Sequence, residues 1–442
     1  MMQYIPNILF IIALVAGVGY FIKNIRKVIR NIRLGKELDR SDNKKERFKN
    51  VAMIALGQSK MVRRPISGIL HIVVYVGFLI INIEVLEIII DGIFGTHRIF
   101  AFLGGAYDFL IGSFEILAFL VFVGVVLFWT RRNLIKLKRF WNPEMKGWPK
   151  NDGNIILYFE MVLMTLFLVM NASDLQLQEL GADHYIKAGA YPISQFIAPL
   201  FDGMSETSLM FIERGAWWLH ILGILVFLNY LYFSKHLHIL LAFPNTYYGD
   251  LKPKGELDNL EAVTNEVKLM MDPTADPFAA PADDQAEGEP EKFGASDVTD
   301  LNWVQLLNSY TCTECGRCTS ECPANQTGKK LSPRKIMMDT RDRLKEVGDN
   351  IDKNGSFVDD GKQLLNDYIT PEELWACTSC NACVEACPVS ISPLSIIIDM
   401  RRYLVMEESA APSDLNNMMS NIENNGAPWP FNQMDRLNWS NE

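Results

Sequence analysis

The chain has 442 residues, of which 49% are hydrophobic and 21% are charged, and its formal net charge is −10. This length allows two or three domains, and composition divides the chain: the first 245 residues contain long apolar runs, whereas the remainder is acidic and contains every cysteine. Nucleic acid is disfavoured as a partner, because the positive charge lies beside the apolar runs and forms no separate basic stripe.

Five apolar segments in the first 245 residues approach or exceed the length needed to cross a bilayer. They lie at about 4–22, 66–90, 109–130, 155–171 and 217–243. The first segment could be a signal peptide, but basic residues follow it and none precedes it, which is the reverse of a cleaved signal. The sequence therefore predicts a bundle of five membrane-spanning helices over residues 1–245.

The loops between these spans predict their orientation. Residues 23–65 and 131–150 are rich in Lys and Arg, whereas 91–108 and 172–216 carry few basic residues. Basic loops face the cytoplasm. We therefore expect a multi-pass protein of the inner (cytoplasmic) membrane whose N-terminus lies outside and whose C-terminal half lies in the cytoplasm.

The C-terminal half divides into three parts. Residues 246–300 are rich in Pro, Ala and acidic residues, a composition that cannot bury a core and that predicts an extended linker. Residues 301–408 contain helical stretches that begin at Ser332-Pro333 and Ser392-Pro393, since Pro suits the first helical turn, and they predict a small α-helical domain. The Asn-rich segment 409–442 is expected to be a partner-binding tail because it contains Trp and Phe, although a disordered end is the alternative.

All eight cysteines lie in two runs, C-x2-C-x2-C-x3-C-P, that begin at Cys312 and Cys377. This spacing is typical of ferredoxins with two 4Fe–4S clusters, in which three cysteines of a run bind one cluster and the fourth binds the other. Zinc sites usually pair two C-x2-C units across a longer gap, and disulfides are disfavoured because no cysteine lies outside the runs. We therefore expect one cluster on Cys312, Cys315, Cys318 and Cys387, and the other on Cys377, Cys380, Cys383 and Cys322.

Four of the six histidines lie in the second and fifth predicted spans. Imidazoles at one depth on two facing helices can ligate haem iron, and His71 and His238 both lie near the cytoplasmic ends of their spans. In one continuous helix His220 and His238 would share a face, whereas His236 would point about 160° away. We expect His71 and His238 to bind a haem b, with His236 and His220 as further candidates. The alternative is that His236 and His238 only mark the interfacial end of a span.

Four carboxylates, Glu84, Glu87, Glu115 and Glu160, fall within or near the apolar spans. A carboxylate inside the membrane is costly and is usually functional. We expect Glu84 and Glu115 to serve a quinone or a proton route to it, whereas Glu87 and Glu160 also fit positions near an interface.

The five spans, His71 and the element Ser234-Lys235-His236-Leu237-His238 resemble the cytochrome b (gamma) subunit of respiratory nitrate reductase and the membrane subunit of methanogen heterodisulfide reductase. That family carries two haem-ligating histidines in helix two. Ile81 stands near where the second would fall, so the resemblance implies only the haem nearer the cytoplasm.

Residues 301–408 are similar to the ferredoxin-type C subunit of heterodisulfide reductase. The fusion and the tail from Gly426 to Trp439 are similar to membrane iron–sulfur oxidoreductases that couple electron-transfer flavoprotein to menaquinone. In those proteins a similar tail leads into a cysteine-rich CCG domain with a further cluster.

These features predict the electron-transfer subunit of a quinone-linked oxidoreductase, which is not complete alone. It would relay electrons between menaquinone and a CCG-domain subunit or electron-transfer flavoprotein, through two 4Fe–4S clusters and a haem b. The alternative is a haem-free membrane anchor and docking ferredoxin subunit of a larger respiratory complex. A complete substrate-reducing enzyme is disfavoured, because every cysteine is already a predicted cluster ligand and no G-x-G-x-x-G or Walker A motif is present.

Overall fold

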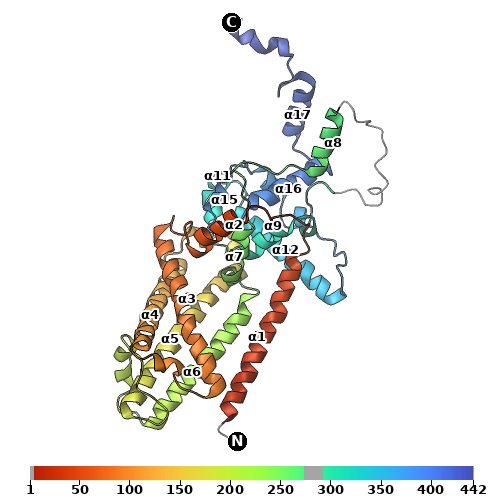
Figure 1. Ribbon diagram of the computed structural model, residues 1–442. Helices are drawn as coiled ribbons and strands as arrows, with labels where there is room; N and C mark the ends of the chain where they lie inside the picture. Colours follow the sequence, from red (N-terminus) through yellow and green to blue (C-terminus); the bar gives the residue numbers. More distant parts are fainter. Residues whose placement is uncertain (1–3, 273–291, 442) are drawn as a thin grey trace.

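The computed structural model describes residues 4–272 and 292–441. Long helices form a bundle, and a domain of shorter helices packs against one end of it (Figure 1). Within the described ranges the chain forms two isolated β-bridges and no β-strand. The prediction of a mainly α protein, with a five-helix bundle followed by a small helical domain, is therefore confirmed.

Among the described residues, five helices are long and apolar enough to cross a membrane, and each overlaps one of the five predicted spans. They are α1 (Ile5–Ile32), α3 (Pro65–Phe94), α4 (Gly105–Asn133), α5 (Trp148–Leu180) and α6 (Glu206–Leu231). Helix α4 packs against α3 and α5, α5 packs against α6, and α1 packs against α3 and α6. Their outer faces expose large apolar side chains such as Ile12, Leu79 and Phe119. Exposed apolar side chains of this kind suit contact with lipid.

Glycine permits close contact between α1 and α3 near the far end of the bundle, which is the end away from the cluster domain. A Cβ atom at Gly92 would lie 2.7 Å from the Phe10 ring. Small residues allow such approach between membrane helices. Helix α3 then ends at Gly95, whose left-handed φ of +70° suits a C-terminal cap.

The fifth predicted span, 217–243, is not a single helix, and that prediction was wrong. Helix α6 ends at Leu231, a short 3-10 turn follows at Lys235–Leu237, and the separate helix α7 spans His238–Tyr247. His220 and His238 therefore belong to different helices. The helical phase that related them does not apply.

Asp152 of α5 holds the chain in this break. Its buried carboxylate accepts hydrogen bonds from the Tyr230 hydroxyl at 2.6 Å, the Ser234 hydroxyl at 2.7 Å and the Lys235 N–H at 3.0 Å. The Ser234 oxygen also accepts the His236 N–H at 3.1 Å. Because a buried carboxylate without donors is costly, these contacts favour the turn over a continuous helix.

The cluster domain is built from eight helices within the described residues, and the other short elements connect or extend the two domains. The domain helices are α9 (Trp303–Thr311), α10 (Arg317–Glu321), α11 (Pro323–Gln326), α12 (Pro333–Asn354), α13 (Leu364–Asp367), α14 (Pro371–Trp375), α15 (Ala382–Ala386) and α16 (Pro393–Met406). The others are α2 (Lys44–Asn50), a π-helix at Val51–Leu56, α8 (Glu261–Met271), α17 (Ser413–Asn425) and 3-10 turns at Ile99–Leu103, Lys138–Phe140, Pro143–Met145, Ser194–Phe196, Ala198–Phe201, Val298–Asp300 and Gln433–Asn441.

The two predicted Ser-Pro helix starts are confirmed in α12 and α16. The hydroxyl of Ser332 accepts the N–H of Lys335, and that of Ser392 accepts the N–H of Ser395. Each serine thereby pairs one of the N–H groups that a helix start leaves free.

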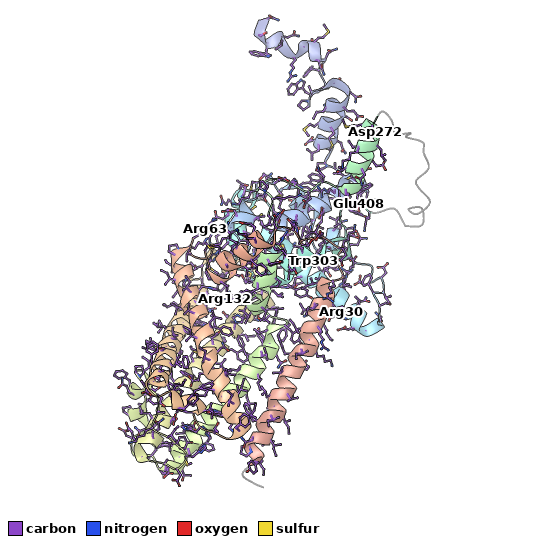
Figure 2. The ribbon with its side chains drawn as sticks, in the orientation of Figure 1. Arg30, Arg63, Arg132, Asp272, Trp303 and Glu408 are labelled. Atoms are coloured by element: carbon purple, nitrogen blue, oxygen red, sulfur yellow. The ribbon has the colours of Figure 1, made fainter. Side chains whose placement is uncertain are left out.

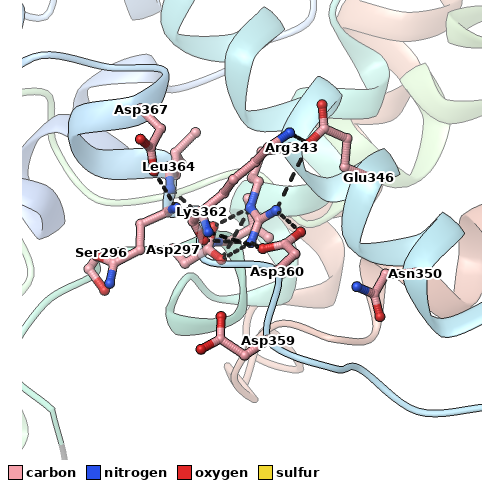
Figure 3. A network of polar contacts seen from close by, with 12 residues as sticks. Ser296, Asp297, Arg343, Glu346, Asn350, Asp359, Asp360, Lys362, Leu364 and Asp367 are labelled. Carbon is pink, nitrogen blue, oxygen red and sulfur yellow. Dashed lines mark hydrogen bonds and ion pairs between the residues drawn. The ribbon is translucent and has the colours of Figure 1, made fainter. Parts of the chain in front are cut away.

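Arg343 of α12 ties the beginning of the cluster domain to its middle (Figure 3). Its guanidinium is fully buried and forms ion pairs with Asp297 at 2.8 Å and Asp360 at 2.6 Å. It also donates to the Lys362 carbonyl at 2.8 Å. The buried Arg343 charge needs this partner, because an unpaired buried charge is costly. Asp297 is therefore part of the folded cluster domain and not of the linker.

The extended linker predicted for residues 246–300 is shorter than expected. Residues 246 and 247 end α7, and 261–271 form helix α8. Ala295 and Val298 are buried in the core of the cluster domain. The stretch 273–291, where the Pro and acidic residues are densest, lies outside the described residues.

The tail leaves the cluster domain on the side opposite the bundle (Figure 1). It contains α17 and a final 3-10 turn, and its aromatic residues Trp429, Phe431 and Trp439 are exposed. Their role as a partner-binding surface stays a prediction.

Candidate functional site

The two cysteine runs adopt the same local fold. Glu314 and Gly316 have left-handed φ values of 55° and 72°, and the equivalent residues Ser379 and Asn381 have 55° and 60°. A short helix follows each loop, α10 in the first run and α15 in the second. Gly and Asn adopt left-handed geometry with little penalty, so each sequence allows a tight turn between its first and third cysteine.

The structure brings the cysteines together in two mixed groups. Cys387 lies close enough to Cys312 and Cys318 to act on them electrostatically, and Cys315 acts on Cys387 in the same way. These four border one small cavity, which Cys383 of the second run also lines. We call them the membrane-side group.

The remaining four cysteines, Cys322, Cys377, Cys380 and Cys383, form the surface-side group. Cys322 and Cys380 act electrostatically on Cys377 and Cys383. Helices α10 and α15 pack against each other, so the last cysteine of each run reaches the other group. The grouping is the one that crossed ligation requires, and the ligation itself stays a prediction.

The chemistry of both groups fits 4Fe–4S clusters. All eight cysteines are free thiols, and burial raises the pKa of Cys312 and Cys383 to about 12. Thiolates in such surroundings need nearby positive charge, which cluster iron supplies. Among residues 4–272 and 292–441, no three His, Cys, Asp or Glu side chains converge closely enough to hold a single ion.

The two groups differ in their surroundings. Cys380 of the surface-side group is exposed. The membrane-side group lies against the bundle, because Arg317 beside it donates to the carbonyls of Lys60 at 3.1 Å and Met61 at 3.2 Å, just before α3. Sequence analysis missed Arg317. The available signal was the contrast between Gly-Arg in the first run and Asn-Ala in the second.

A polar interface fixes the cluster domain on the bundle. Glu144 pairs with the fully buried Arg334 of α12 at 2.7 Å, and Arg30 at the end of α1 donates to the Gly348 carbonyl at 2.9 Å. Near this junction the indole N–H of Trp303 donates to the Leu38 carbonyl at 3.0 Å (Figure 2). The side chains of both domains therefore define how they dock.

Three histidines meet beneath the membrane-side group. His238 acts electrostatically on His71, and both act on His236. The rings of His236 and His238 have centroids 5.5 Å apart. The prediction that His236 points away was wrong, because the break after α6 places it beside His238.

Two features of these histidines fit a haem iron. The Nδ1 of His238 lies 3.0 Å from the Lys235 carbonyl, a contact that fixes the ring and leaves Nε2 free to bind a metal. The buried Nδ1 of His71 has no hydrogen-bond partner among the described residues. Arg317 acts electrostatically on His71 as well as on Cys315, so it lies near both the histidines and the membrane-side group.

The other histidines lie elsewhere. His220 is buried in α6, with its Nδ1 3.0 Å from the Leu163 carbonyl and its ring beside Phe167. His97 and His184 adjoin each other at the far end. The side chain of His97 is only 7% exposed and pairs with Asp174 at 3.2 Å.

The carboxylates predicted to lie in the membrane spans differ in their hydrogen-bond partners. Glu115 is fully buried and accepts the N–H groups of Ile193 and Ser194 at 2.9 and 3.1 Å, which ties a far-end loop to α4. Glu84 is 3% exposed, and its Oε2 has no partner among the described residues.

Glu84 borders a cavity of about 490 Å³ at the far end, which Arg98, Asp174 and Trp217 also line. Of the four carboxylates, Glu160 lies nearest the histidines, 3.9 Å from the Nε2 of His236.

Comparison with known proteins bears on the cysteine groups. Residues 311–391 match the family model of a 4Fe–4S dicluster domain. The chain carries such a domain.

The chain also aligns with curated relatives over most of its length. It is 30% identical to the probable iron–sulfur-binding oxidoreductase FadF of Bacillus subtilis, over 98% of this chain and 61% of the relative. It is 26% identical to the EtfAB:quinone oxidoreductase of Syntrophomonas wolfei, over 92% of this chain and 55% of that protein.

A shorter match is to the ferredoxin-type C component of a heterodisulfide reductase, the ferredoxin/F420H2-dependent CoB-CoM enzyme of Methanosarcina acetivorans. The two are 35% identical over 24% of this chain and 52% of that relative. The chain thus spans less than two thirds of the relatives it matches, which are iron–sulfur oxidoreductases or parts of them. No solved structure matches it significantly.

Proposed function

We propose that this chain is the membrane-bound electron-transfer subunit of a quinone-linked oxidoreductase, relaying electrons between a cytoplasmic redox partner and menaquinone. The order of three groups through the molecule carries the proposal. The surface-side group includes the exposed Cys380, the membrane-side group lies against the bundle, and the three histidines lie beneath it.

Each cysteine group would hold one 4Fe–4S cluster, and His71 and His238 would hold one haem b. When bound, these cofactors supply the one-electron carriers that side chains lack. The chain's own residues position them: backbone N–H groups of Glu314 and Ser379 donate to the sulfurs of Cys312 and Cys377. Such contacts orient ligands and stabilise their negative charge.

His236 offers a third imidazole beside His71 and His238. It is therefore a stronger candidate for a haem ligand than its position in one continuous helix indicated. His220 has a backbone carbonyl and a phenyl ring as its neighbours, which supports one haem and not two.

Glu84 is proposed to exchange protons for the quinone reaction. Its unpaired carboxylate borders the far-end cavity, and it lies thirteen residues from His71 on α3, roughly 20 Å along the helix. That separation suits a proton site better than direct contact with the haem. The hydrogen bonds of Glu115 support a structural role for it.

The partner is proposed to be electron-transfer flavoprotein or a CCG-domain iron–sulfur subunit. The name of the Syntrophomonas wolfei relative specifies EtfAB and a quinone for that protein. On this chain, a partner would approach the exposed surface-side group. The basic loops next to this end of the bundle support a cytoplasmic location for it in an inner-membrane protein.

A reduced-minus-oxidised optical spectrum of the purified full chain tests the relay. A b-type haem gives a sharp α band, which iron–sulfur clusters do not produce, and His71→Ala should remove it. His184→Ala, a histidine at the far end, is the matched control and should retain the band. Intact clusters without any α band in the wild type would instead mean a haem-free anchor and docking subunit.

A further inference from the structure

Cationic side chains are unevenly distributed around the two cysteine groups. Four of them act electrostatically on the membrane-side group: Lys60 on Cys387, Arg139 and Arg317 on Cys315, and Arg341 on Cys312. Around the surface-side group the corresponding contact is that of Arg401 with Cys377. Glu314 adds one negative charge beside Cys312, but it is paired with both Lys235 and Arg341.

The cations of the membrane-side group are held in place. Arg317 is 4% exposed and donates to the Lys60 and Met61 carbonyls. A Cβ atom at Gly316 would lie 2.6 Å from Arg334 Nη1 and 3.3 Å from the Arg139 Cβ. Glycine between Cys315 and Cys318 thus lets two arginines pack directly on the cysteine loop.

The second run lacks these features at equivalent positions. Asn381 replaces Gly316, and Ala382 replaces Arg317. Cys380 is also exposed, so solvent and salt weaken any charge effect there. The internal repeat therefore keeps its backbone shape in both runs but differs in charge.

This asymmetry affects reduction potential. Adding an electron to a cluster adds negative charge, which nearby cations stabilise, and net charge and exposure are among the factors that set cluster potentials. Burial alone opposes the added charge, but it also strengthens attraction to fixed cations because the local dielectric is low. Since four cations surround the membrane-side group, we expect attraction to exceed the cost of burial.

We propose that the cluster held by the membrane-side group has a higher reduction potential than the cluster held by the surface-side group. This inference rests on the proposed binding of two 4Fe–4S clusters. An electron that entered beside Cys380 would then move downhill towards the bundle: one cluster would be oxidised by one electron, the other would be reduced by one, and no proton would be required. Two of the responsible cations, Lys60 and Arg139, belong to the membrane domain, so docking of the two domains contributes to the direction of flow.

Redox titration of the full chain, followed by EPR with chemical mediators, tests this proposal. Arg317→Gln should lower the potential of the higher-potential cluster by about 59 mV or more, which is a tenfold change in a one-electron equilibrium constant. The lower-potential cluster should not move. The matched control, Arg401→Gln, should shift the lower-potential cluster instead.

Two further variants keep the test decisive if Arg317→Gln loses iron. Lys60→Gln and Arg139→Gln lie outside the cluster domain and should each lower the higher potential while iron and sulfide contents stay at wild-type values. The proposal is overturned if these variants shift the lower-potential cluster, or if neither potential moves.

Mediators replace both partner and quinone, so the titration is independent of the relay. If the two clusters had equal or reversed reduction potentials and the protein still reduced quinone, only the proposed order of potentials would be rejected. Two clusters with the expected ordering but no electron transfer to quinone would reject only the relay. Absence of two clusters would reject both.

Discussion

Lys235, which follows the break after α6, forms an ion pair with Glu314 inside the first cysteine run. Both side chains are buried, at 9% and 2% exposure, and Arg341 of α12 pairs with the same carboxylate at 2.7 Å. One carboxylate thus joins the membrane bundle, a cysteine loop and the longest helix of the cluster domain.

Lys235→Met should destabilise the docked protein by about 1–3 kcal/mol, because the buried Glu314 carboxylate loses one of its two cationic partners and keeps only Arg341. Denaturant unfolding in detergent, followed by cluster absorbance, measures the loss. The control is Lys330→Met, whose pair with Glu372 is 63% exposed on both sides and should contribute much less, because solvent screens it. Equal losses in the two variants would contradict the role of the buried pair.

Cys387→Ser should disturb the cluster of the membrane-side group, although Cys387 belongs to the second run, because the ligation that we propose is crossed. Cys322→Ser should disturb the other cluster. EPR of the reduced proteins distinguishes the two signals. Loss of the cluster bound mainly by the same run in both variants would overturn the pairing.

His71→Ala and His238→Ala should each abolish the b-type haem while both iron–sulfur clusters persist, because the cysteines lie in the other domain. His236→Ala should also weaken haem binding, since its ring adjoins that of His238. Haem and iron quantification gives the result, and His220→Ala should retain full haem. A His71→Ala protein with its full haem content would end this assignment.

The contact between the cluster domain and the bundle should weaken in acid, because Glu144 loses its charge and its ion pair with Arg334. Burial alone would raise the pKa of this carboxyl, but the hydrogen bond and charge of Arg334 hold it below its ordinary value of 4.5. The pair therefore contributes stability above about pH 4.5, and that contribution is lost as pH falls through the lowered pKa. The free energy of unfolding of wild type and Glu144→Gln, measured from about pH 7 to pH 3, should converge in acid. A constant difference would show that Glu144 stays paired or contributes nothing.

Protease added to right-side-out vesicles should spare residues 252–272, which we place in the cytoplasm. The far-end loop at 190–206 should be the accessible site. Inside-out vesicles are the control, and there the accessibility should be reversed. Cleavage at 252–272 from the outside would refute the proposed orientation.

The features with a regular sequence pattern were predictable. Long apolar runs required spanning helices, and the repeated cysteine spacing alone indicated two groups. The Ser-Pro helix starts were equally local, because a serine hydroxyl caps the N–H groups that follow it within one turn.

The break in the fifth span was not predictable from local pattern. It depends on Asp152, about eighty residues earlier in the chain, whose carboxylate binds Tyr230, Ser234 and Lys235. Apolar residues continue on both sides of the break, so hydropathy does not reveal it. The position of His236 depended on the same long-range contacts.

The far-end carboxylates were also not predictable from local sequence pattern. Glu84 and Glu115 both lie in apolar helices, and only the folded chain shows that one is satisfied by backbone N–H groups and the other is not. The cations near the cysteines, apart from Arg317 in the first run, come from segments far apart in the sequence, such as Lys60, Arg139 and Arg341, so their convergence could not be derived from spacing.

The interface between the two domains includes direct contacts made outside the segment that connects them. Lys36, for example, exchanges backbone hydrogen bonds with Leu301 and Trp303 at 2.8 and 3.1 Å. A protein held together in this way does not need one continuous polypeptide. Its membrane and cluster halves could be synthesised as two separate chains, split between 272 and 292, and still assemble into the same electron path.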